Sequence, residues 1–113
     1  MVIDFGAYEE TINHEFKGGK GDTLLKKHED ELGKILYGRL EPGSSIGFHK
    51  HETDSEIIYI LRGKANIFYD DTTEELGPGG CHYCPMGHSH SMANQGVEDL
   101  IFFAVVPQHR VDI

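Results

Sequence analysis

Short apolar segments alternate with clusters of turn-forming residues along much of the chain. The segments 57–61, 65–69 and 100–106 are rich in β-branched and aromatic residues, have the length of a strand, and are bounded by glycine, proline, serine or aspartate. Many short strands separated by turns are typical of a sandwich or a barrel. The pattern therefore predicts an all-β fold.

Residues 23–36 allow a second interpretation. Their apolar positions recur near a 3.6-residue spacing behind Asp22, as in a capped helix. Gly33 would then sit inside the helix, at a cost of about 1 kcal/mol relative to alanine. A polar turn formed by Glu29, Asp30, Glu31 and Gly33 explains the same residues. We therefore predict two strands joined by this turn.

Composition and charge narrow the class of protein. The 113 residues are 38% hydrophobic and 26% charged, which predicts one globular domain over residues 1–113. A formal net charge of -9 argues against nucleic acid or an anionic membrane as a partner. Residues 1–10 lack the basic and apolar stretches of a secretory signal, so we expect a cytoplasmic protein.

Four metal-binding residue types stand at suggestive spacings. His49 and His51 project from the same face if they lie on a strand, so both can meet one ion. Turn formers at 53–55 reset the alternation and let Glu56 approach from a neighbouring strand. His90 follows a further turn at 85–87 and can supply a third imidazole. This donor set suits a divalent transition metal with open coordination positions.

These residues lie in two motifs that resemble the paired motifs of the cupin superfamily. The first runs over 43–63, where Gly43 and Gly63 flank His49, His51 and Glu56; the second runs over 79–94. In the second, the matching residues are Gly79, Pro85, Gly87, His90 and Asn94.

The resemblance implies an antiparallel double-stranded β-helix, or jelly-roll barrel, with extra amino-terminal strands that often make dimer contacts. It also implies that His49, His51, Glu56 and His90 bind one divalent metal ion per chain inside the barrel. Iron, manganese, nickel, zinc, cobalt and copper all remain candidates.

Other residues near the motifs have less specific roles. His88 shares the parity of His90, so it is a candidate general acid or base, or a histidine hydrogen-bonded at the barrel mouth. Ile58, Ile60 and Met92 are expected to form apolar walls of a substrate pocket.

The segment Cys81, His82 and Cys84 has no assigned role. A second metal site or a redox pair would need further ligands or a strand-to-helix context that the sequence lacks. Small residues buried on a strand before Pro85 are the simpler interpretation.

Two functional hypotheses follow. One is a metal-dependent enzyme that acts on a small polar molecule, an organic acid or a sugar-like compound, by dioxygenase, decarboxylase, lyase or isomerase chemistry. The other is a non-catalytic module that binds or senses a small ligand. In both, the partners are a small molecule and a second copy of the chain in a homodimer.

Overall fold

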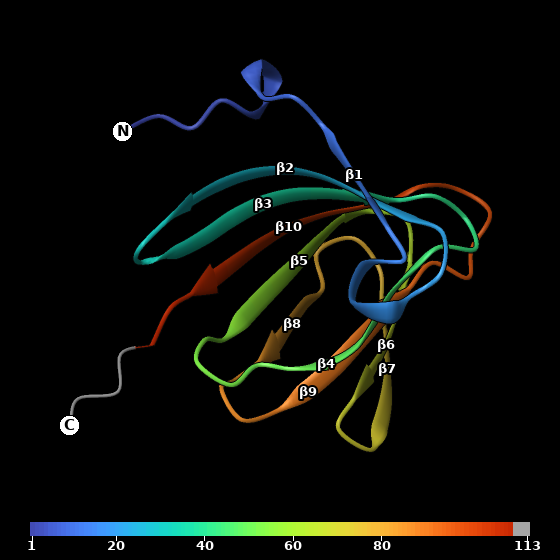
Figure 1. Cartoon of the computed structure of the whole chain (residues 1–113). Coiled ribbons are helices and arrows are strands. Elements are labelled where there is room, and N and C mark those ends of the chain that lie inside the picture. The colour runs from blue at the N-terminus through green and yellow to red at the C-terminus, as the bar shows by residue number, and fades with distance from the viewer. Residues whose placement is uncertain (110–113) are drawn as a thin grey trace.

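The computed structural model describes residues 1–109, and within them ten strands form two antiparallel sheets (Figure 1). The six-stranded sheet has the order β1-β2-β3-β10-β5-β8 and contains β1 (Thr11–His14), β2 (Asp22–Asp30), β3 (Gly33–Leu40), β5 (Glu56–Arg62), β8 (Cys81–Cys84) and β10 (Leu100–Pro107). The four-stranded sheet has the order β4-β9-β6-β7 and contains β4 (Ser45–Lys50), β6 (Ala65–Tyr69), β7 (Thr72–Leu76) and β9 (Ser89–Ala93). Two 3₁₀ turns, η1 (Phe5–Ala7) and η2 (Phe16–Gly18), flank β1.

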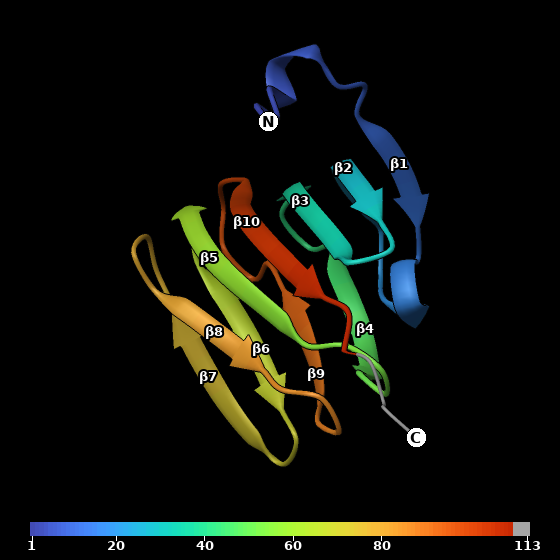
Figure 2. The ribbon, with the colours of Figure 1, turned by 90° about the vertical axis from the view of Figure 1, so that its left-hand side faces the viewer.

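The two sheets face each other around a shared interior, which confirms the predicted jelly roll (Figures 1 and 2). The non-consecutive neighbours, such as β10 between β3 and β5 and β9 between β4 and β6, are crossovers that wind the chain from one sheet to the other. β1 and β2 extend the six-stranded sheet beyond β3, as expected for additional amino-terminal strands.

The predicted strand pair over 23–36 is confirmed, although its turn is tighter than expected. β2 and β3 pair from Thr23 with Leu40 to Asp30 with Gly33, so Glu29 and Asp30 belong to the strand. Only residues 31 and 32 connect the two strands. A Cβ added to Gly33, which has a φ of 141°, would lie 2.2 Å from the Val106 carbonyl oxygen. The glycine is therefore needed where the hairpin meets the end of β10.

Strict alternation places one face of each central strand in the core. On β10, Leu100, Phe102 and Ala104 are buried while the residues between them are partly exposed. The Phe102 ring packs over Gly38 of β3, where an added Cβ would lie 2.1 Å from the ring. The register of β3 against β10 thus depends on a small residue opposite a large one.

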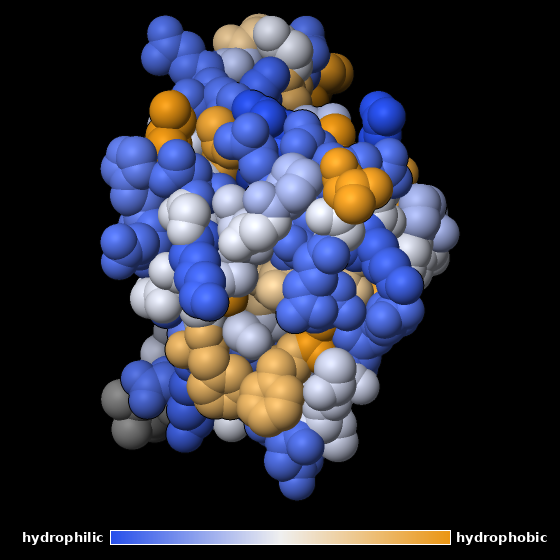
Figure 3. All heavy atoms as spheres, turned by 90° about the vertical axis from the view of Figure 1, so that its right-hand side faces the viewer, coloured by the Kyte–Doolittle hydropathy of each residue, from blue (hydrophilic) through white to orange (hydrophobic). Residues whose placement is uncertain are grey.

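Both sheets expose some large hydrophobic side chains on their outer faces. Figure 3 shows a face that is mostly hydrophilic, with hydrophobic side chains in separate groups. On the outer face of the six-stranded sheet, Ile57, Tyr59, Leu61 and Tyr83 are 38–56% exposed. Tyr59 alternates along β5 with the buried Ile58 and Ile60. Within residues 1–109, no helix has the length and apolar character needed to cross a membrane.

Candidate metal centre

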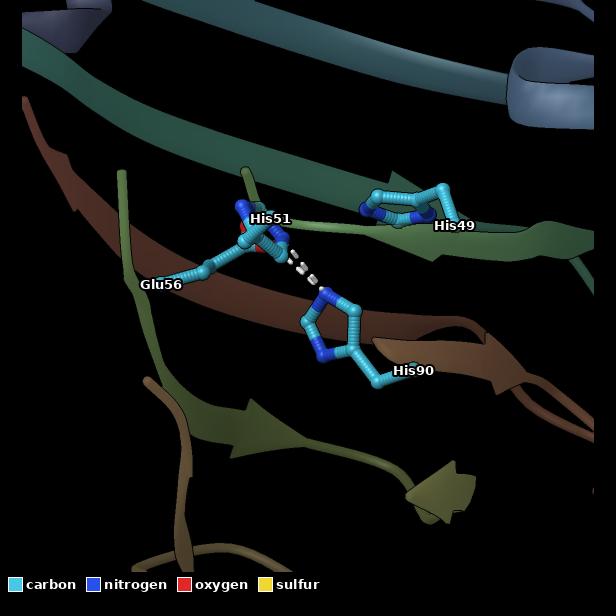
Figure 4. A group of neighbouring side chains, drawn as sticks. All are labelled: His49, His51, Glu56 and His90. Atoms are coloured by element: carbon cyan, nitrogen blue, oxygen red, sulfur yellow. Dashed lines mark hydrogen bonds and ion pairs between the residues drawn. The ribbon is translucent and has the colours of Figure 1, made fainter. Parts of the chain in front are cut away.

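Four side chains from both sheets converge in the barrel interior. His49 lies on β4, His51 directly follows it, His90 lies on β9, and Glu56 begins β5 on the opposite sheet. One potential ligand atom from each residue lies within 4.8 Å of all the others. Figure 4 shows the imidazoles of His51 and His90 directed toward each other beside the Glu56 carboxylate.

A bulge in β4 directs His49 into the barrel. The register between β4 and β9 shifts between Ile46 and His49, so both of these residues face inward while Phe48 is 52% exposed. Such an extra residue changes the direction of the side chains that follow it. Gly47 lies within the bulge, and a Cβ there would lie 2.0 Å from the Lys17 carbonyl oxygen in the η2 segment. The bulge therefore requires glycine at this position.

His51 lies beyond the last residue of β4, so strand alternation does not explain its direction. Two backbone hydrogen bonds hold it in place: its N–H donates to the His88 carbonyl (3.0 Å), and its carbonyl accepts from the Gly87 N–H (2.7 Å). The turn before β9 thus positions one candidate metal ligand by main-chain contacts.

Hydrogen bonds determine which ring nitrogen two of the histidines present. His49 Nδ1 lies 2.7 Å from the Gly47 carbonyl oxygen, which can only accept, so Nδ1 carries the proton. His51 Nδ1 lies 2.6 Å from Asp54 Oδ1 and donates in the same way. In the neutral form of either ring, the Nε2 lone pair can therefore bind a metal ion.

The spacing of the ligand atoms fits one ion. His51 Nε2 lies 2.9 Å from His90 Nε2, and Glu56 Oε1 lies 3.3 Å and 3.0 Å from these two nitrogens. Ligands at about 2.1 Å from a metal and at right angles to each other are about 3 Å apart. Two nitrogen lone pairs at this distance repel each other unless they share a cation or a proton. Three imidazoles and a carboxylate match the divalent transition metals expected from the sequence.

The same contacts shift the pKa values of the group. Burial would raise the pKa of Glu56, but hydrogen bonds with His51 and His90 outweigh it and lower the pKa to about 2. Burial lowers the pKa of His49, so its ring is neutral at neutral pH. Burial opposes the charge on His51, yet bonds to Glu56 and Asp54 raise its pKa overall. Glu56 therefore supplies a negative charge throughout the physiological range.

A cavity of about 390 Å³ leads to this group between β4 and the strands β1 to β3. His49, His51 and Glu56 lie in its wall. Its apolar lining comes from Phe16, Leu25, Leu36, Ile46, Phe102 and Val106. The cavity can thus hold a small molecule beside an ion bound by the four side chains.

The expected pocket walls are corrected by this geometry. Ile58, Ile60 and Met92 point inward, as alternation predicted, but they are at most 2% exposed in the packed core and do not line the cavity. The cavity lies instead beside β1, β2 and β3, whose residues form part of its wall. The sequence could not reveal which side of the metal group stays open.

His88 also lies elsewhere than expected. β9 begins at Ser89, so His88 belongs to the preceding turn and the parity argument from His90 does not reach it. Its Nδ1 lies 2.6 Å from Asp70 Oδ2 and 3.2 Å from the Tyr69 hydroxyl, and its side chain is 44% exposed. The structure places it in neither the ligand group nor the cavity wall.

His82, to which the sequence assigns no role, lies beside the four-residue group. It is 2% exposed on β8, and its Nε2 lies 3.0 Å from His90 Nδ1. Its pairing with Ile58 puts it on the inner face, a signal available only once the β5–β8 register is known. Of the two neighbouring thiols, Cys84 is buried as expected, whereas Cys81 is exposed. The two thiols are free and on opposite faces of β8.

Comparisons with known proteins agree with the fold and the motifs. Residues 36–106 match the family model described as a cupin domain. An oxalate-binding protein from Thermotoga maritima is 39% identical over 97 residues, which cover 80% of this chain and 79% of that protein.

Solved structures extend the likeness to nearly the whole chain. A crystal structure from Thermotoga maritima, described as a predicted oxalate decarboxylase, has a TM-score of 0.90 and 30% identity over 96% of this chain and 99% of that one. The polyketide cyclase RemF from Streptomyces resistomycificus has a TM-score of 0.79 and 26% identity over 99% and 82% of the two chains. The fold, both motifs and these matches show that the chain belongs to the cupin family.

Proposed function

We propose that His49, His51, Glu56 and His90 bind one divalent transition metal ion per chain. The observation that carries this proposal is the convergence of their ligand atoms within 4.8 Å beside a cavity. A metal held by four side chains can keep positions open for an oxygen ligand and act there as a Lewis acid.

We further propose that the ligand or substrate is a small organic acid. Four of the ten basic residues of this acidic chain, Lys17, Lys27, Lys34 and Lys50, line the cavity. Lys27 and Lys34 also pair with Glu29, at 3.2 Å and 4.0 Å. Glu52, Asp54 and Glu56 line the same cavity, so its four lysines exceed its three carboxylates by one, and a bound divalent cation would add to this excess and favour an anion. The relative named as oxalate-binding supports the same class.

Enzyme and binding module remain the two forms of this proposal. Metal-dependent turnover, for which we retain dioxygenase, decarboxylase, lyase and isomerase chemistry, is supported by the open cavity and by the relative described as a predicted decarboxylase. Binding without turnover is supported by the position of His88, which leaves the expected acid or base outside the cavity. Within the cavity wall, the lysines would orient an anion and the apolar side would limit water.

The experiment has three stages on the same purified protein. Metal content is measured after reconstitution with Mn²⁺, Co²⁺ and Zn²⁺; one ion per chain in the wild type and much less in His51→Ala supports the site. Oxalate is then titrated calorimetrically into the loaded and metal-free forms. Metal-dependent binding supports an organic acid, and release of carbon dioxide selects the decarboxylase over the binding module.

Lys50→Gln tests the role of charge in the cavity wall. Lys64→Gln is the matched control, because Lys64 does not line the cavity and forms an ion pair with Glu75 at a distance of 2.7 Å. Weaker oxalate binding in Lys50→Gln alone, with a smaller salt dependence, supports the proposal. No metal uptake by the wild type with any of the three ions would refute the metal site.

We also propose a homodimer formed through the outer face of the six-stranded sheet. The exposed apolar side chains Ile57, Tyr59, Leu61 and Tyr83 come from adjacent strands β5 and β8, where Ile57 and Tyr83 are direct partners. Such a contiguous apolar face is typical of an interface. Light scattering should give twice the chain mass, and Tyr59→Lys should reduce it. Phe68→Lys on the other sheet is the control; a monomeric wild type at high micromolar concentration contradicts the proposal.

A further inference from the structure

His82 is a buried polar residue that the four-residue metal group does not use. Its side chain is 1% exposed, and its ring plane is inclined by only 28° to that of His90, with the ring centroids 5.2 Å apart. One ring nitrogen, Nε2, lies 3.0 Å from His90 Nδ1, and the other, Nδ1, lies 2.8 Å from Glu74 Oε1 on β7. Both nitrogens are therefore engaged by these two contacts, and His82 is not one of the four residues whose ligand atoms converge.

The direction of each proton in this chain of contacts follows from Glu74. A carboxylate accepts, so His82 Nδ1 carries the proton and donates it to Glu74. In a neutral ring His82 Nε2 is then an acceptor, and His90 Nδ1 must be the donor to it. His90 is left with a lone pair on Nε2, the atom that faces His51 and Glu56.

We propose that Glu74 and His82 are positioning residues that hold His90 in its metal-binding tautomer and increase its donor strength. This inference rests on the proposed metal site. A carboxylate behind a ligating histidine is a known way to orient the ring and make it more basic. Here a second histidine extends that contact, because Glu74 does not itself reach His90.

His90 differs in this respect from the other two histidines. Asp54 and the Gly47 carbonyl lie within three residues of the rings they support, so local structure orients His51 and His49. His90 is supported by β8 of the opposite sheet and, through it, by β7. The orientation of His90 therefore depends on the closure of the barrel. A substitution of Glu74, on the partly exposed strand β7, should change the orientation of the His90 ring through His82.

The first experiment measures Zn²⁺ and Co²⁺ affinity by competition with a chromophoric chelator. His82→Leu removes the acceptor for His90 Nδ1, and we expect affinity to fall about 10- to 100-fold. In Glu74→Gln the metal affinity should fall by a smaller factor, because the amide oxygen can still accept a hydrogen bond from His82. His82→Gln should recover part of the loss, because its amide oxygen can accept from His90. Glu75→Gln is the matched control, since Glu75 pairs with Lys64 instead.

The second experiment reads the tautomer directly. Imidazole nitrogen chemical shifts of the metal-free and Zn²⁺-loaded proteins should show His90 protonated at Nδ1 in the wild type and in His82→Gln. In the metal-free protein, they should show a mixture of His90 tautomers in His82→Leu. A purely structural role of His82 would not change this signal.

The outcomes separate this inference from the proposed function. If the wild type binds no metal, the proposed metal site fails. If the wild type binds metal but His82→Leu and Glu74→Gln bind within twofold of it and His90 keeps its tautomer, the positioning role is overturned. If His82→Leu does not fold, the same criteria apply to Glu74→Gln and His82→Gln.

Discussion

Strand β5 places Glu56 and Ile60 on the same inner face of the barrel, but the two ends of this strand have different surroundings. Around Ile60, the residues Leu40, Leu100 and Ala65 are all 0% exposed and apolar; we call this the apolar end. Around Glu56 lie His49, His51 and His90; we call these four residues the metal end. Their hydrogen bonds require defined orientations of the side chains. The same alternation therefore builds a packed core at one end and a set of ligands at the other.

The comparison shows how one small barrel separates stability from chemistry. Burial of apolar area stabilises the fold without regard to direction. A buried carboxylate or imidazole is instead costly unless it is paired, so the metal end must be fully hydrogen-bonded. Substitutions at the two ends should accordingly have different consequences.

The largest effect on folding is expected at the apolar end. Ile60 is 0% exposed, so Ile60→Ala leaves a cavity where the side-chain atoms were packed. The free energy of unfolding should therefore fall by about 2–5 kcal/mol. Urea denaturation measures this change. The folded fraction should still bind metal with the wild-type stoichiometry, because Glu56 and the histidines are untouched. A loss of metal affinity as large as the loss of stability would show that the two ends are not separate.

The opposite pattern is expected for Glu56→Gln. The amide keeps the shape of the side chain but removes the charge that His51 and His90 approach at 3.3 Å and 3.0 Å. Loss of a residue that only supports a metal ligand lowers metal affinity by up to about 100-fold. Loss of the charge on a proposed ligand should lower it by at least about 100-fold. Chelator competition measures it, and the circular dichroism spectrum should remain that of a β protein.

A smaller effect is expected for a residue that supports a ligand from a local position. Asp54→Asn weakens the hydrogen bond with His51 Nδ1, whose length is 2.6 Å, and should lower metal affinity about tenfold. The same chelator competition applies. Thr53→Ser, in the adjacent turn, is a control that should leave the affinity unchanged.

The smallest effect concerns the two sides of β8. Burial, together with the negative charges of Glu56 and Asp70, raises the pKa of the Cys84 thiol to about 12, whereas Cys81 is exposed. Cys81 pairs with Tyr59 on the face proposed for the dimer, so a thiol-reactive dye at pH 8 should label one thiol in the dilute, monomeric native chain and two after denaturation. Rapid labelling of both thiols in the native chain would contradict the buried position of Cys84.

The same thiol gives a pH dependence with a defined sign. Above its ordinary pKa of about 9 the Cys84 thiol ionises in the unfolded chain but stays protonated in the folded one. Its contribution to stability is therefore complete below pH 9 and decreases between about pH 9 and pH 12. Urea denaturation at pH 8 and pH 10.5 should show a smaller decrease in Cys84→Ala than in the wild type.

Local patterns were enough to predict many elements of this molecule. The segments 65–69 and 100–106 correspond to β6 and most of β10, and the turn signals around residue 31 gave the correct choice of strands over a helix. The spacing of His49, His51, Glu56 and His90 identified the group that the structure brings together. These features are readable because alternation and turn chemistry act over a few residues.

Other features depend on contacts between distant strands. The bulge that turns His49 inward requires Gly47 to fit against the η2 segment, and the cavity wall requires β2 and β3 to lie beside the metal group. Neither contact has a signature in the local sequence. The misplacement of His88 has the same cause, because parity holds only within a strand and β9 begins one residue later.

The sequence by itself determined the strands and turns, which are encoded by residue types at short spacings, and the four candidate ligands, which lie in two motifs that resemble those of a known family. Only the tertiary structure decided what supports the ligands and where the cavity opens. His82 shows the reason most clearly: it is eight residues from His90 along the chain, and it reaches His90 and Glu74 because the closing of the two sheets places β7, β8 and β9 around it.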